Sequence, residues 1–460
     1  MSVACGLECV FCLGCTRWAW KRLTYVGSYD SESWPPASDE EIEPIPRLCR
    51  AILAVYEDDL SHPRFPPPSG YGMNPQWLLK RVPYEETEGQ CPPYLIYADH
   101  DHREIILAVR GLNLSRESDY KVLLDNRLGR QMFDGGYVHH GLLKAATFIL
   151  NRESEMLRRV IGEVGEEYKL VFAGHSLGSG VAALMTVIVV NHRDQFGGIE
   201  RRRIRCYAIA PARCMSLNLA VKYADVINSV VLQDDFLPRT PTPLEHIFGS
   251  IFCLPCFLFL VCLRDTFIPE SRKLNDPRRL YAPGRMYHIV ERKFCRCGRF
   301  PPEVRTAIPV EGRFEHIVLS CNATSDHALL WIEREAQKIF DIRKEDAETT
   351  TAPAQQKMER KQTLEKEYKG ALERAVTLNV PHAISPLEPT EDEIDSAPSQ
   401  NQNEGVINSS HSENQNGTHS KTDSKPSGRT NWDELVEKLF TRNESGNFVL
   451  RKDIGNIEGH

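Results

Sequence analysis

Apolar residues between positions 93 and 342 alternate between short runs and longer stretches with helical spacing. Several short runs are continuously apolar and rich in β-branched residues, which is typical of strands covered on both faces in a parallel sheet. They fall at 94–98, 105–109, 170–173, 206–210, 226–232, 287–290 and 317–319. The helical stretches fall at 141–160, 178–191, 215–223 and 327–340. This alternation predicts an α/β fold with a mostly parallel, doubly wound sheet.

The segment before this domain, residues 1–92, has a different pattern. Residues 28–46 are acidic and rich in proline, as in a linker or a surface wrap. Residues 46–60 have the spacing of a helix, which the prolines at 63 and 66–68 end. The first two apolar runs, 94–98 and 105–109, predict a hairpin with a charged turn at the start of the main domain, residues 93–342.

Beyond residue 342 the chain loses its apolar periodicity. Residues 343–429 are rich in Glu, Lys, Ser, Asn, Gln and Thr, which favours disorder, although residues 357–375 can form a charged helix. Residues 430–442 again have apolar side chains at helical spacing, with Asn431 and Glu434 placed to cap the start. This amphipathic helix either docks onto the body or a partner, or forms only transiently at the end of the chain.

Four cysteines near the N-terminus indicate a possible membrane contact. Cys5, Cys9, Cys12 and Cys15 lie among apolar and aromatic residues, and two basic residues follow. Such thiols are candidates for S-acylation, which would attach the protein to a membrane surface. The alternative is a buried apolar plug with unmodified thiols.

Composition narrows the class of protein. The chain has 460 residues and a net charge of -7, which argues against a nucleic-acid-binding protein, whose surface would be basic. The 14 cysteines include two short pairs without a matching second pair, so we expect no metal. No signal-peptide pattern opens the chain, which predicts a reducing, cytoplasmic compartment where the sequons at Asn113 and Asn322 stay inert.

One motif carries specific chemistry. Gly174, Ser176 and Gly178 form a G-x-S-x-G between an apolar strand and an apolar helix. A sharp strand-to-helix turn needs glycines where side chains would collide, and it lifts the serine hydroxyl clear of the sheet. The amide of Leu177 lies at the helix N-terminus, where it can stabilise an oxyanion. The motif in this context predicts an α/β-hydrolase with Ser176 as its nucleophile.

A serine nucleophile needs a histidine base and a carboxylate, which follow it along the chain in α/β-hydrolases. Asp234 and Asp235 both come directly after an apolar run, where an acid can reach across to the histidine. His327 lies after another run, at the start of a helix. The residues themselves leave the choice between the two aspartates open.

Five landmarks resemble the class 3 lipases, an α/β-hydrolase family, and among them the plant and diacylglycerol-lipase-like members. Between residues 93 and 340 these are Val109-Arg-Gly-Leu112, Val138-His-His-Gly-Leu-Leu143, Gly-His-Ser-Leu-Gly178, Asp235-Phe-Leu-Pro-Arg239 and Ser325-Asp-His327. The family's acid precedes two apolar residues and a proline, which implies Asp235. The resemblance also implies the Leu112 amide as the second oxyanion donor, where relatives often carry a Thr or Ser hydroxyl.

The resemblance gives no catalytic part to the other histidines near these landmarks. His139 and His140 belong to a motif whose role in the family looks structural. His175 directly precedes the serine, and in such elbows this residue packs against the neighbouring strand and points away from the hydroxyl.

An uncharged apolar run at 247–263 lies between the acid and the base, where diacylglycerol lipases also carry an insertion. It is short for a membrane span of about 20 residues, and Pro255 would break a helix within it. We expect a lid or a bilayer-touching insert that covers the acyl channel. The alternative is a pair of helices buried against the domain.

The resemblance implies a serine lipid-ester hydrolase of the acylglycerol lipase type, with a Ser176, Asp235 and His327 triad and no cofactor. Its expected partners are a lipid substrate and a membrane surface, which implies a peripheral membrane protein. The alternative is a catalytically silent hydrolase fold that acts as a scaffold or sensor through its tail and membrane contacts. Plant relatives have been linked to calmodulin, but the 432–440 segment carries acidic residues, which leaves calmodulin a remote option.

Overall fold

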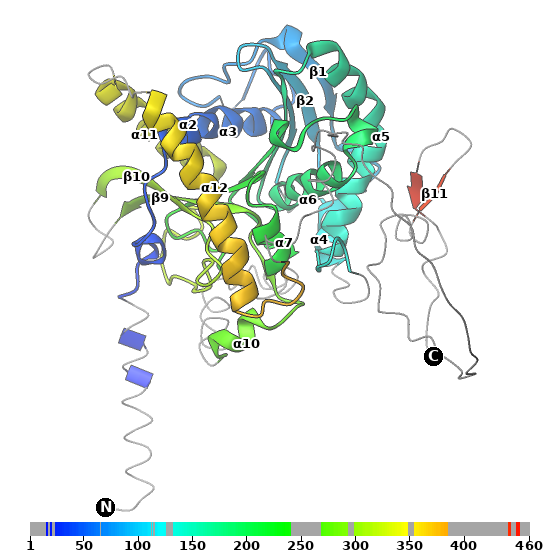
Figure 1. Ribbon diagram of the computed structural model, residues 1–460. Coiled ribbons are helices and arrows are strands. Elements are labelled where there is room, and N and C mark those ends of the chain that lie inside the picture. Colours follow the sequence, from blue (N-terminus) through cyan, green and yellow to red (C-terminus); the bar gives the residue numbers. More distant parts are fainter. Residues whose placement is uncertain are drawn as a thin grey trace, which may run out of the picture. The chain divides into compact units, whose positions relative to one another are not determined.

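Eight strands form one mixed sheet in the computed structural model of the protein (Figure 1). The structure describes residues 15–16, 19–20, 24–64, 66–111, 113, 116–125, 132–240, 268–292, 299–347, 354–384, 440–442 and 448–450. The chain forms two compact units, Met1–Ala383 and Ile384–His460, and the sheet belongs to the first. Its strands, in the order in which they lie side by side, are β1 (Leu78–Val82), β2 (Tyr94–Asp99), β3 (Glu104–Val109), β4 (Lys169–His175), β5 (Ile204–Ile209), β7 (Ile227–Leu232), β9 (Arg285–Arg292) and β10 (Arg299–Ala307).

The centre of the sheet is parallel and its edges are antiparallel. From β3 to β9 neighbouring strands pair in parallel, whereas β1 with β2, β2 with β3 and β9 with β10 pair antiparallel. Every residue of β2 and β3 is buried, as their continuous apolar runs predict. The predicted α/β fold with a mostly parallel sheet is thus confirmed, and so is the first hairpin, whose turn joins Asp99 to Glu104.

Helices cover both faces of the sheet (Figure 1). On one face, α3 (Pro44–Ala54) and α11 (Leu329–Ala347) share a core with alternate strand residues, among them Val171 and Ala173. Successive strand residues point to opposite faces, so Leu170 and Phe172 face the other side. There α6 (Leu177–Asn191) packs on β4 and β5, and α5 (His140–Val164) packs on α6. Since α6 is covered on all sides, its apolar sequence is buried throughout.

The remaining described elements are short, except α12. The helices are α2 (Asp39–Ile42), α4 (Glu117–Leu124), α7 (Leu217–Lys222), α10 (Glu270–Leu274) and α12 (Ala354–Thr377). Short 3-10 helices cover Gly27–Ser31, Pro75–Trp77, Tyr84–Glu86, Arg193–Phe196 and Arg201–Arg203. A two-stranded ladder joins β6 (Met215–Ser216) to β8 (Leu280–Tyr281).

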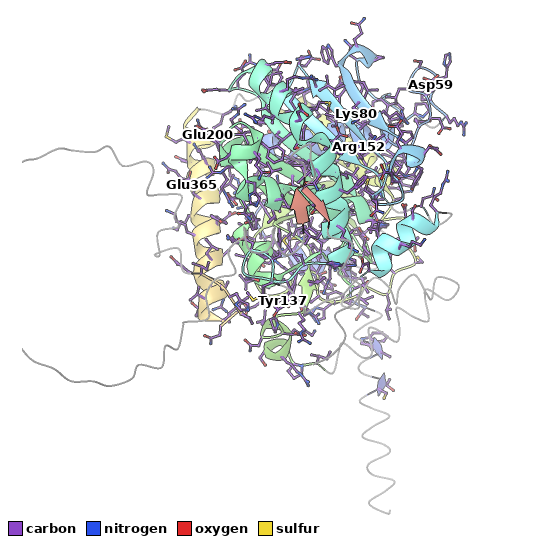
Figure 2. All side chains as sticks on the ribbon, turned by 90° about the vertical axis from the view of Figure 1, so that its right-hand side faces the viewer. Asp59, Lys80, Tyr137, Arg152, Glu200 and Glu365 are labelled. Atoms are coloured by element: carbon purple, nitrogen blue, oxygen red, sulfur yellow. The ribbon has the colours of Figure 1, made fainter. Side chains whose placement is uncertain are left out.

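A buried carboxylate fastens α5 to the edge of the sheet. Glu153 is 1% exposed and accepts hydrogen bonds of 2.6 Å from Lys80 Nζ on β1 and from Tyr94 Oη on β2. The neighbouring Arg152 donates to the Glu86 carbonyl oxygen at 2.5 Å. Figure 2 shows Lys80 and Arg152 close together on this side of the molecule. These contacts fix the β1–β2 edge relative to α5.

Two boundaries differ from the sequence predictions. The expected linker at 28–46 contains α2, which begins with a capping box between Ser38 and Glu41, and α3 begins at Pro44, where proline is tolerated in a first helical turn. The expected strand at 317–319 is absent from the described residues 299–347, where β10 is the strand instead. The two prolines of β10 argue against a strand in the sequence, although an edge strand tolerates proline.

Helix α12 occupies part of the segment for which disorder was predicted. The prediction for 343–429 is wrong at 354–377, where the charged-helix alternative describes the structure. Tyr368 Oη donates to the Lys222 carbonyl oxygen at 2.6 Å, and Arg285 pairs with Glu367 at 2.5 Å. Ala371 and Ala375 are buried. The few buried apolar side chains of this charged segment show no helical periodicity in the sequence. Its contacts are made with residues that lie far away in the sequence.

Several predicted features lie outside the described residues. These are Cys5, Cys9 and Cys12, the apolar run 247–263, and residues 430–439 of the expected amphipathic helix. The last three residues of that helix, Phe440–Arg442, form strand β11 instead, which pairs antiparallel with β12 (Phe448–Leu450) in the second unit. Turn-forming Asn and Gly residues lie between them in the sequence. Within the described residues, no helix is both long and apolar enough to span a membrane.

Candidate active site

The turn from β4 to α6 holds Ser176 in a strained backbone conformation. Ser176 has φ 54° and ψ −117°, a backbone conformation that residues other than glycine rarely adopt. Its amide donates to the Ile209 carbonyl oxygen at 3.0 Å, and the residue is 6% exposed. The neighbouring glycines leave no room for a side chain: a Cβ at Gly174 would lie 2.2 Å from the Gly178 carbonyl oxygen, and one at Gly178 would lie 2.3 Å from the Arg110 carbonyl oxygen.

A second serine supports this turn from below. Ser179 Oγ donates to the Ser176 carbonyl oxygen at 2.5 Å and accepts from the Ala212 amide at 3.0 Å. Its side chain is fully buried. It therefore ties the first turn of α6 to the loop after β5. Ser179 could not be found from the sequence, because a serine in a helix has no distinctive spacing.

One predicted site residue, His327, lies within hydrogen-bond distance of two others, Ser176 and Asp235. His327 Nε2 is 2.9 Å from Ser176 Oγ, and His327 Nδ1 is 3.0 Å from Asp235 Oδ1. Asp235 is fully buried and also accepts from the Leu237 amide at 3.0 Å. A carboxylate accepts from Nδ1–H, which leaves Nε2 as the acceptor for the serine hydroxyl. The arrangement can remove a proton from Ser176 and return it to a leaving group.

Two family models match the chain. One, Lipase (class 3), matches residues 106–245, and the other, Lipase 3 N-terminal region, matches residues 6–73. The chain belongs to the class 3 lipase family. The resemblance stated from the sequence is therefore confirmed, and the second match extends it to residues before the sheet.

The curated relatives of this class 3 lipase are diacylglycerol lipases. Human diacylglycerol lipase-alpha is 24% identical over 237 residues, which cover 43% of this chain and 22% of that protein. Mouse diacylglycerol lipase-beta is 30% identical over 157 residues, which cover 32% of this chain and 21% of that protein. The chain thus matches about a fifth of the length of these relatives.

The similar solved structures include fungal lipases. The Rhizomucor miehei triacylglyceride lipase is 13% identical, with a TM-score of 0.40, over 60% of this chain and 88% of that chain. A lipase from Rhizopus microsporus var. chinensis is 14% identical, with a TM-score of 0.40, over 64% of this chain and 87% of that chain.

The other candidate acid of this class 3 lipase is turned away from His327. Asp234 Oδ1 accepts from the Gly27 amide at 2.9 Å, and the Asp234 amide donates to Asp326 Oδ2 at 3.0 Å. The residues directly before Asp235 and His327 are thus bonded to each other. This link holds the loop of the acid against the loop of the base.

A buried arginine lies between these two carboxylates. Arg292, at the end of β9, pairs with Asp326 and lies 3.8 Å from an oxygen of Asp234. Burial raises the pKa of Asp326 to about 7, and the positive charge of Arg292 opposes this rise. No spacing in the sequence indicated this cluster, because its members come from three distant segments.

The residues before α2 complete the support of the acid loop. Arg239 pairs with Asp30, and its Nη2 donates to the Gln233 carbonyl oxygen at 2.8 Å. His288 Nε2 lies 2.9 Å from the same oxygen, and its Nδ1 lies 2.7 Å from Ser31 Oγ. Burial, followed by the charge of Arg239, lowers the pKa of His288 to about 3. The segment around residue 30 therefore braces the acid loop.

Two aromatic rings flank the imidazole of His327. The rings of Phe236 and His175 both lie 5.1 Å from it, centroid to centroid. His175 Nε2 is also 2.9 Å from the main-chain carbonyl oxygen of His327. The family resemblance implies only a packing role for His175, whereas the structure joins His175 to the loop that carries His327.

The predicted oxyanion donors are only partly described. Leu177 is the first residue of α6, whose N-terminal amides have no partner within the helix. Leu112 lies outside the described residues. Next to it, the Asn113 amide donates to Asp119 Oδ2 at 2.8 Å, which ties the end of this loop to α4.

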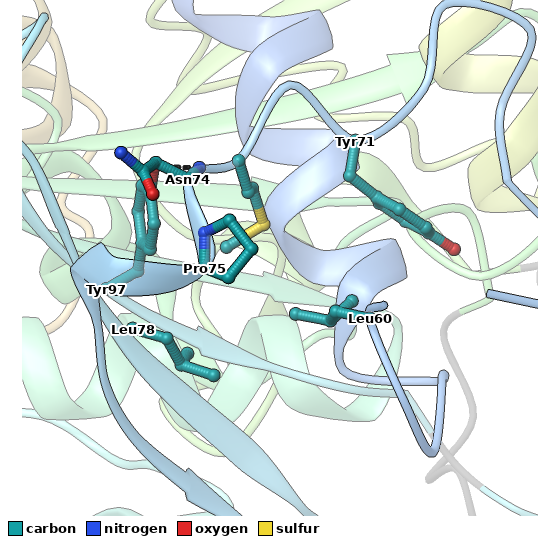
Figure 3. A pocket seen from close by; sticks show the side chains of 7 residues that line it. Leu60, Tyr71, Asn74, Pro75, Leu78 and Tyr97 are labelled. Carbon is teal, nitrogen blue, oxygen red and sulfur yellow. Dashed lines mark hydrogen bonds between the residues drawn. The ribbon is translucent and has the colours of Figure 1, made fainter. Parts of the chain in front are cut away.

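The described residues of this family member contain no cluster of three or more His, Cys, Asp or Glu side chains that could hold a metal ion. The structure contains a small cavity of about 30 Å³, whose lining side chains are drawn in Figure 3. It is lined by Leu60, Tyr71, Met73, Asn74, Pro75, Leu78 and Tyr97. None of Ser176, Asp235 and His327 lines this cavity.

Proposed function

We propose that this chain is a serine lipid-ester hydrolase of the acylglycerol lipase type, with Ser176, His327 and Asp235 as its catalytic residues. The observation that carries the proposal is the pair of hydrogen bonds, 2.9 Å and 3.0 Å long, that joins these residues at a strained strand-to-helix turn. Membership of the class 3 lipase family supports the same reaction. No residue of the proposed mechanism requires a cofactor.

The proposed reaction has two halves. His327 Nε2 accepts the proton of Ser176 Oγ as the oxygen attacks the ester carbonyl carbon, and Asp235 stabilises the resulting imidazolium. The Leu177 amide, with that of Leu112, binds the oxyanion. His327 then gives its proton to the leaving alcohol, which leaves an acyl group on Ser176. Water then attacks this acyl group as His327 accepts its proton, and His327 returns that proton to Ser176 Oγ as the acyl–oxygen bond breaks and the fatty acid is released.

The substrate that we propose is a diacylglycerol presented at a membrane surface. The curated relatives are named diacylglycerol lipases, and the proposal takes its substrate class from that name. A peripheral contact with a lipid surface is part of the proposal, because such a substrate does not leave the bilayer readily.

The test combines active-site labelling with a hydrolysis assay. Wild type is compared with Ser176→Ala and His327→Ala for labelling by a fluorophosphonate and for fatty-acid release from diacylglycerol in phosphatidylcholine vesicles. We expect both variants to lose on the order of 10⁴-fold or more in rate. The exposed Ser271 and His62 provide the controls Ser271→Ala and His62→Ala, which keep wild-type rates. Absence of labelling in folded wild-type protein would instead support a silent scaffold.

A further inference from the structure

Four residues form a continuous chain of hydrogen bonds behind the triad. The Gly111 amide donates to Tyr56 Oη at 2.7 Å, and Tyr56 Oη lies 3.2 Å from His175 Nδ1. On the other side of the ring, His175 Nε2 lies 2.9 Å from the carbonyl oxygen of His327. We call this chain of contacts the Tyr56–His175 link.

Each member of the link has a donor that matches the next acceptor. The phenol oxygen of Tyr56 already accepts from Gly111, so its single hydrogen can donate to Nδ1 of His175. Nδ1 must then be unprotonated, and the Nε2–H donates to the His327 carbonyl oxygen, which can only accept. The link therefore requires a neutral His175 with its proton on Nε2.

The environment of His175 favours this neutral form. Burial lowers the pKa of His175 to about 3, and a positive charge on His327 lowers it in the same direction. A protonated His175 would carry a second N–H toward Tyr56 and a like charge 5.1 Å from the His327 ring. The like charge would oppose the imidazolium that forms on His327 during the proposed reaction, and the second N–H would leave the Tyr56 hydroxyl without its acceptor at Nδ1.

The link joins four different elements of the fold. Tyr56 follows α3, Gly111 follows β3, His175 ends β4, and His327 precedes α11. The guanidinium carbon of Arg110 lies 4.4 Å from the centroid of the Tyr56 ring and holds it against this loop. A Cβ at Gly111 would lie 2.8 Å from Tyr56 Oη and 2.9 Å from His175 Nδ1, so the link fills the space beside this glycine.

We propose that Tyr56 and His175 are positioning residues that hold the oxyanion loop at Gly111 and the base His327 in one fixed arrangement. Gly111 directly precedes Leu112, the proposed oxyanion donor, so one end of the link acts on oxyanion binding and the other on proton transfer. The inference rests on the proposed function. Neither residue takes part in bond making: Tyr56 acts through the main chain of Gly111, which precedes the proposed oxyanion donor, and His175 acts through the main chain of His327.

The kinetic test is a double-mutant cycle. Tyr56→Phe removes only the hydroxyl group, and His175→Gln keeps a donor for the His327 carbonyl oxygen but removes the acceptor that faces Tyr56. We expect each to lower kcat for diacylglycerol hydrolysis about tenfold with KM nearly unchanged, because a misplaced reacting group costs rate rather than binding. Since both break the same link, the double variant should also lose about tenfold. A multiplied loss of about a hundredfold would overturn the proposal.

The matched control is Tyr97→Phe. Tyr97 Oη accepts from the Asn74 amide at 3.0 Å, the same type of bond, beside the small cavity of Figure 3. It should keep the wild-type kcat, and an equal loss there would show a general packing effect and overturn the positioning role. Thermal melting of each variant checks folding. If His175→Gln does not fold, two measurements still test the proposal. One is the kcat of Tyr56→Phe compared with that of Tyr97→Phe, and the other is the tautomer of His175 described below.

A second readout does not depend on hydrolysis. In ¹⁵N-histidine-labelled wild type, His175 should remain the neutral Nε2–H tautomer between about pH 5 and pH 8, where an ordinary histidine titrates. An Nδ1–H tautomer, or titration in this range, would overturn the link even in an active enzyme. If wild type shows the Nε2–H tautomer at His175 but does not hydrolyse the ester, the result would contradict the proposed function and support the link as a structural connection.

Discussion

The turn that carries Ser176 and the loops that carry Asp235 and His327 are held by different kinds of contact. At the serine, the constraint is local: two glycines at which a Cβ would lie within 2.3 Å of a backbone oxygen, and a hydroxyl group three residues further on. At the acid and the base, it is non-local: Arg292 lies between Asp234 and Asp326 in a buried ion cluster, and the segment around residue 30 contacts Asp234 and Arg239. The first depends on shape, and the second depends on charge and therefore on pH.

The largest effect on stability should come from the non-local side. Arg292→Met leaves the buried Asp326 carboxylate without its cation, and loss of one partner from a buried ion pair costs about 3–5 kcal/mol. Asp326 has its pKa raised from 3.8 to about 7, so its folded-state stability contribution is full below pH 3.8 and is lost as pH rises through 7. We therefore expect a greater loss in the free energy of unfolding at pH 8 than at pH 5, as measured by urea denaturation.

The control for this charge effect is Arg159→Met. Its pair with Glu163 is exposed, and an exposed pair contributes less than about 1 kcal/mol. Adding Asp326→Asn to Arg292→Met should restore part of the loss, because it removes the unpaired carboxylate. A loss for Arg292→Met that is the same at both pH values would contradict the electrostatic account.

The next largest effect tests the local side. Gly178→Ala places a Cβ 2.3 Å from the Arg110 carbonyl oxygen, and such overpacking costs about 1–3 kcal/mol, with no dependence on pH. Fluorophosphonate labelling of Ser176 should fall with it, because the turn must open. Gly162→Ala in α5 meets nothing within 4 Å and should raise stability by about 0.5–1 kcal/mol. Equal melting temperatures for both variants would disprove the steric argument.

The same contrast decides how much could be predicted from the sequence. The glycine and serine spacing around Ser176 is local, so it could be read directly, and the family landmarks selected Asp235 and His327. Arg292, Asp30 and Tyr56 could not be found, because each acts on a residue 34 or more positions away in the chain. Likewise, the prolines of β10 and the charged sequence of α12 gave no periodic pattern, since partners elsewhere in the fold hold both elements.

A third prediction concerns buried histidines. His288 has its folded-state pKa lowered from 6.5 to about 3, so its stability contribution is full above pH 6.5 and is lost as pH falls toward 3. Each such group changes the free energy of unfolding by at most about 1.4 kcal/mol per pH unit in this range. His175 behaves in the same way. His288→Gln should therefore reduce the slope of the free energy of unfolding against pH, between pH 3 and pH 6.5, by up to this amount. An unchanged slope would show that His288 is protonated in the folded state.

The smallest effect belongs to the local side again. Ser179→Ala leaves the buried Ala212 amide without its acceptor, and an unsatisfied buried donor costs about 1–3 kcal/mol, with about 1 kcal/mol expected where backbone can relax. Thr363→Ala removes an exposed hydroxyl that donates to the Glu359 carbonyl oxygen at 2.8 Å and should leave stability nearly unchanged. Because the hydrogen bonds of Ser179 join the Ser176 turn to the loop after β5, its loss should be independent of pH and additive with that of Arg292→Met. Strong coupling between the two would mean that the serine turn and the acid and base loops form one unit rather than two.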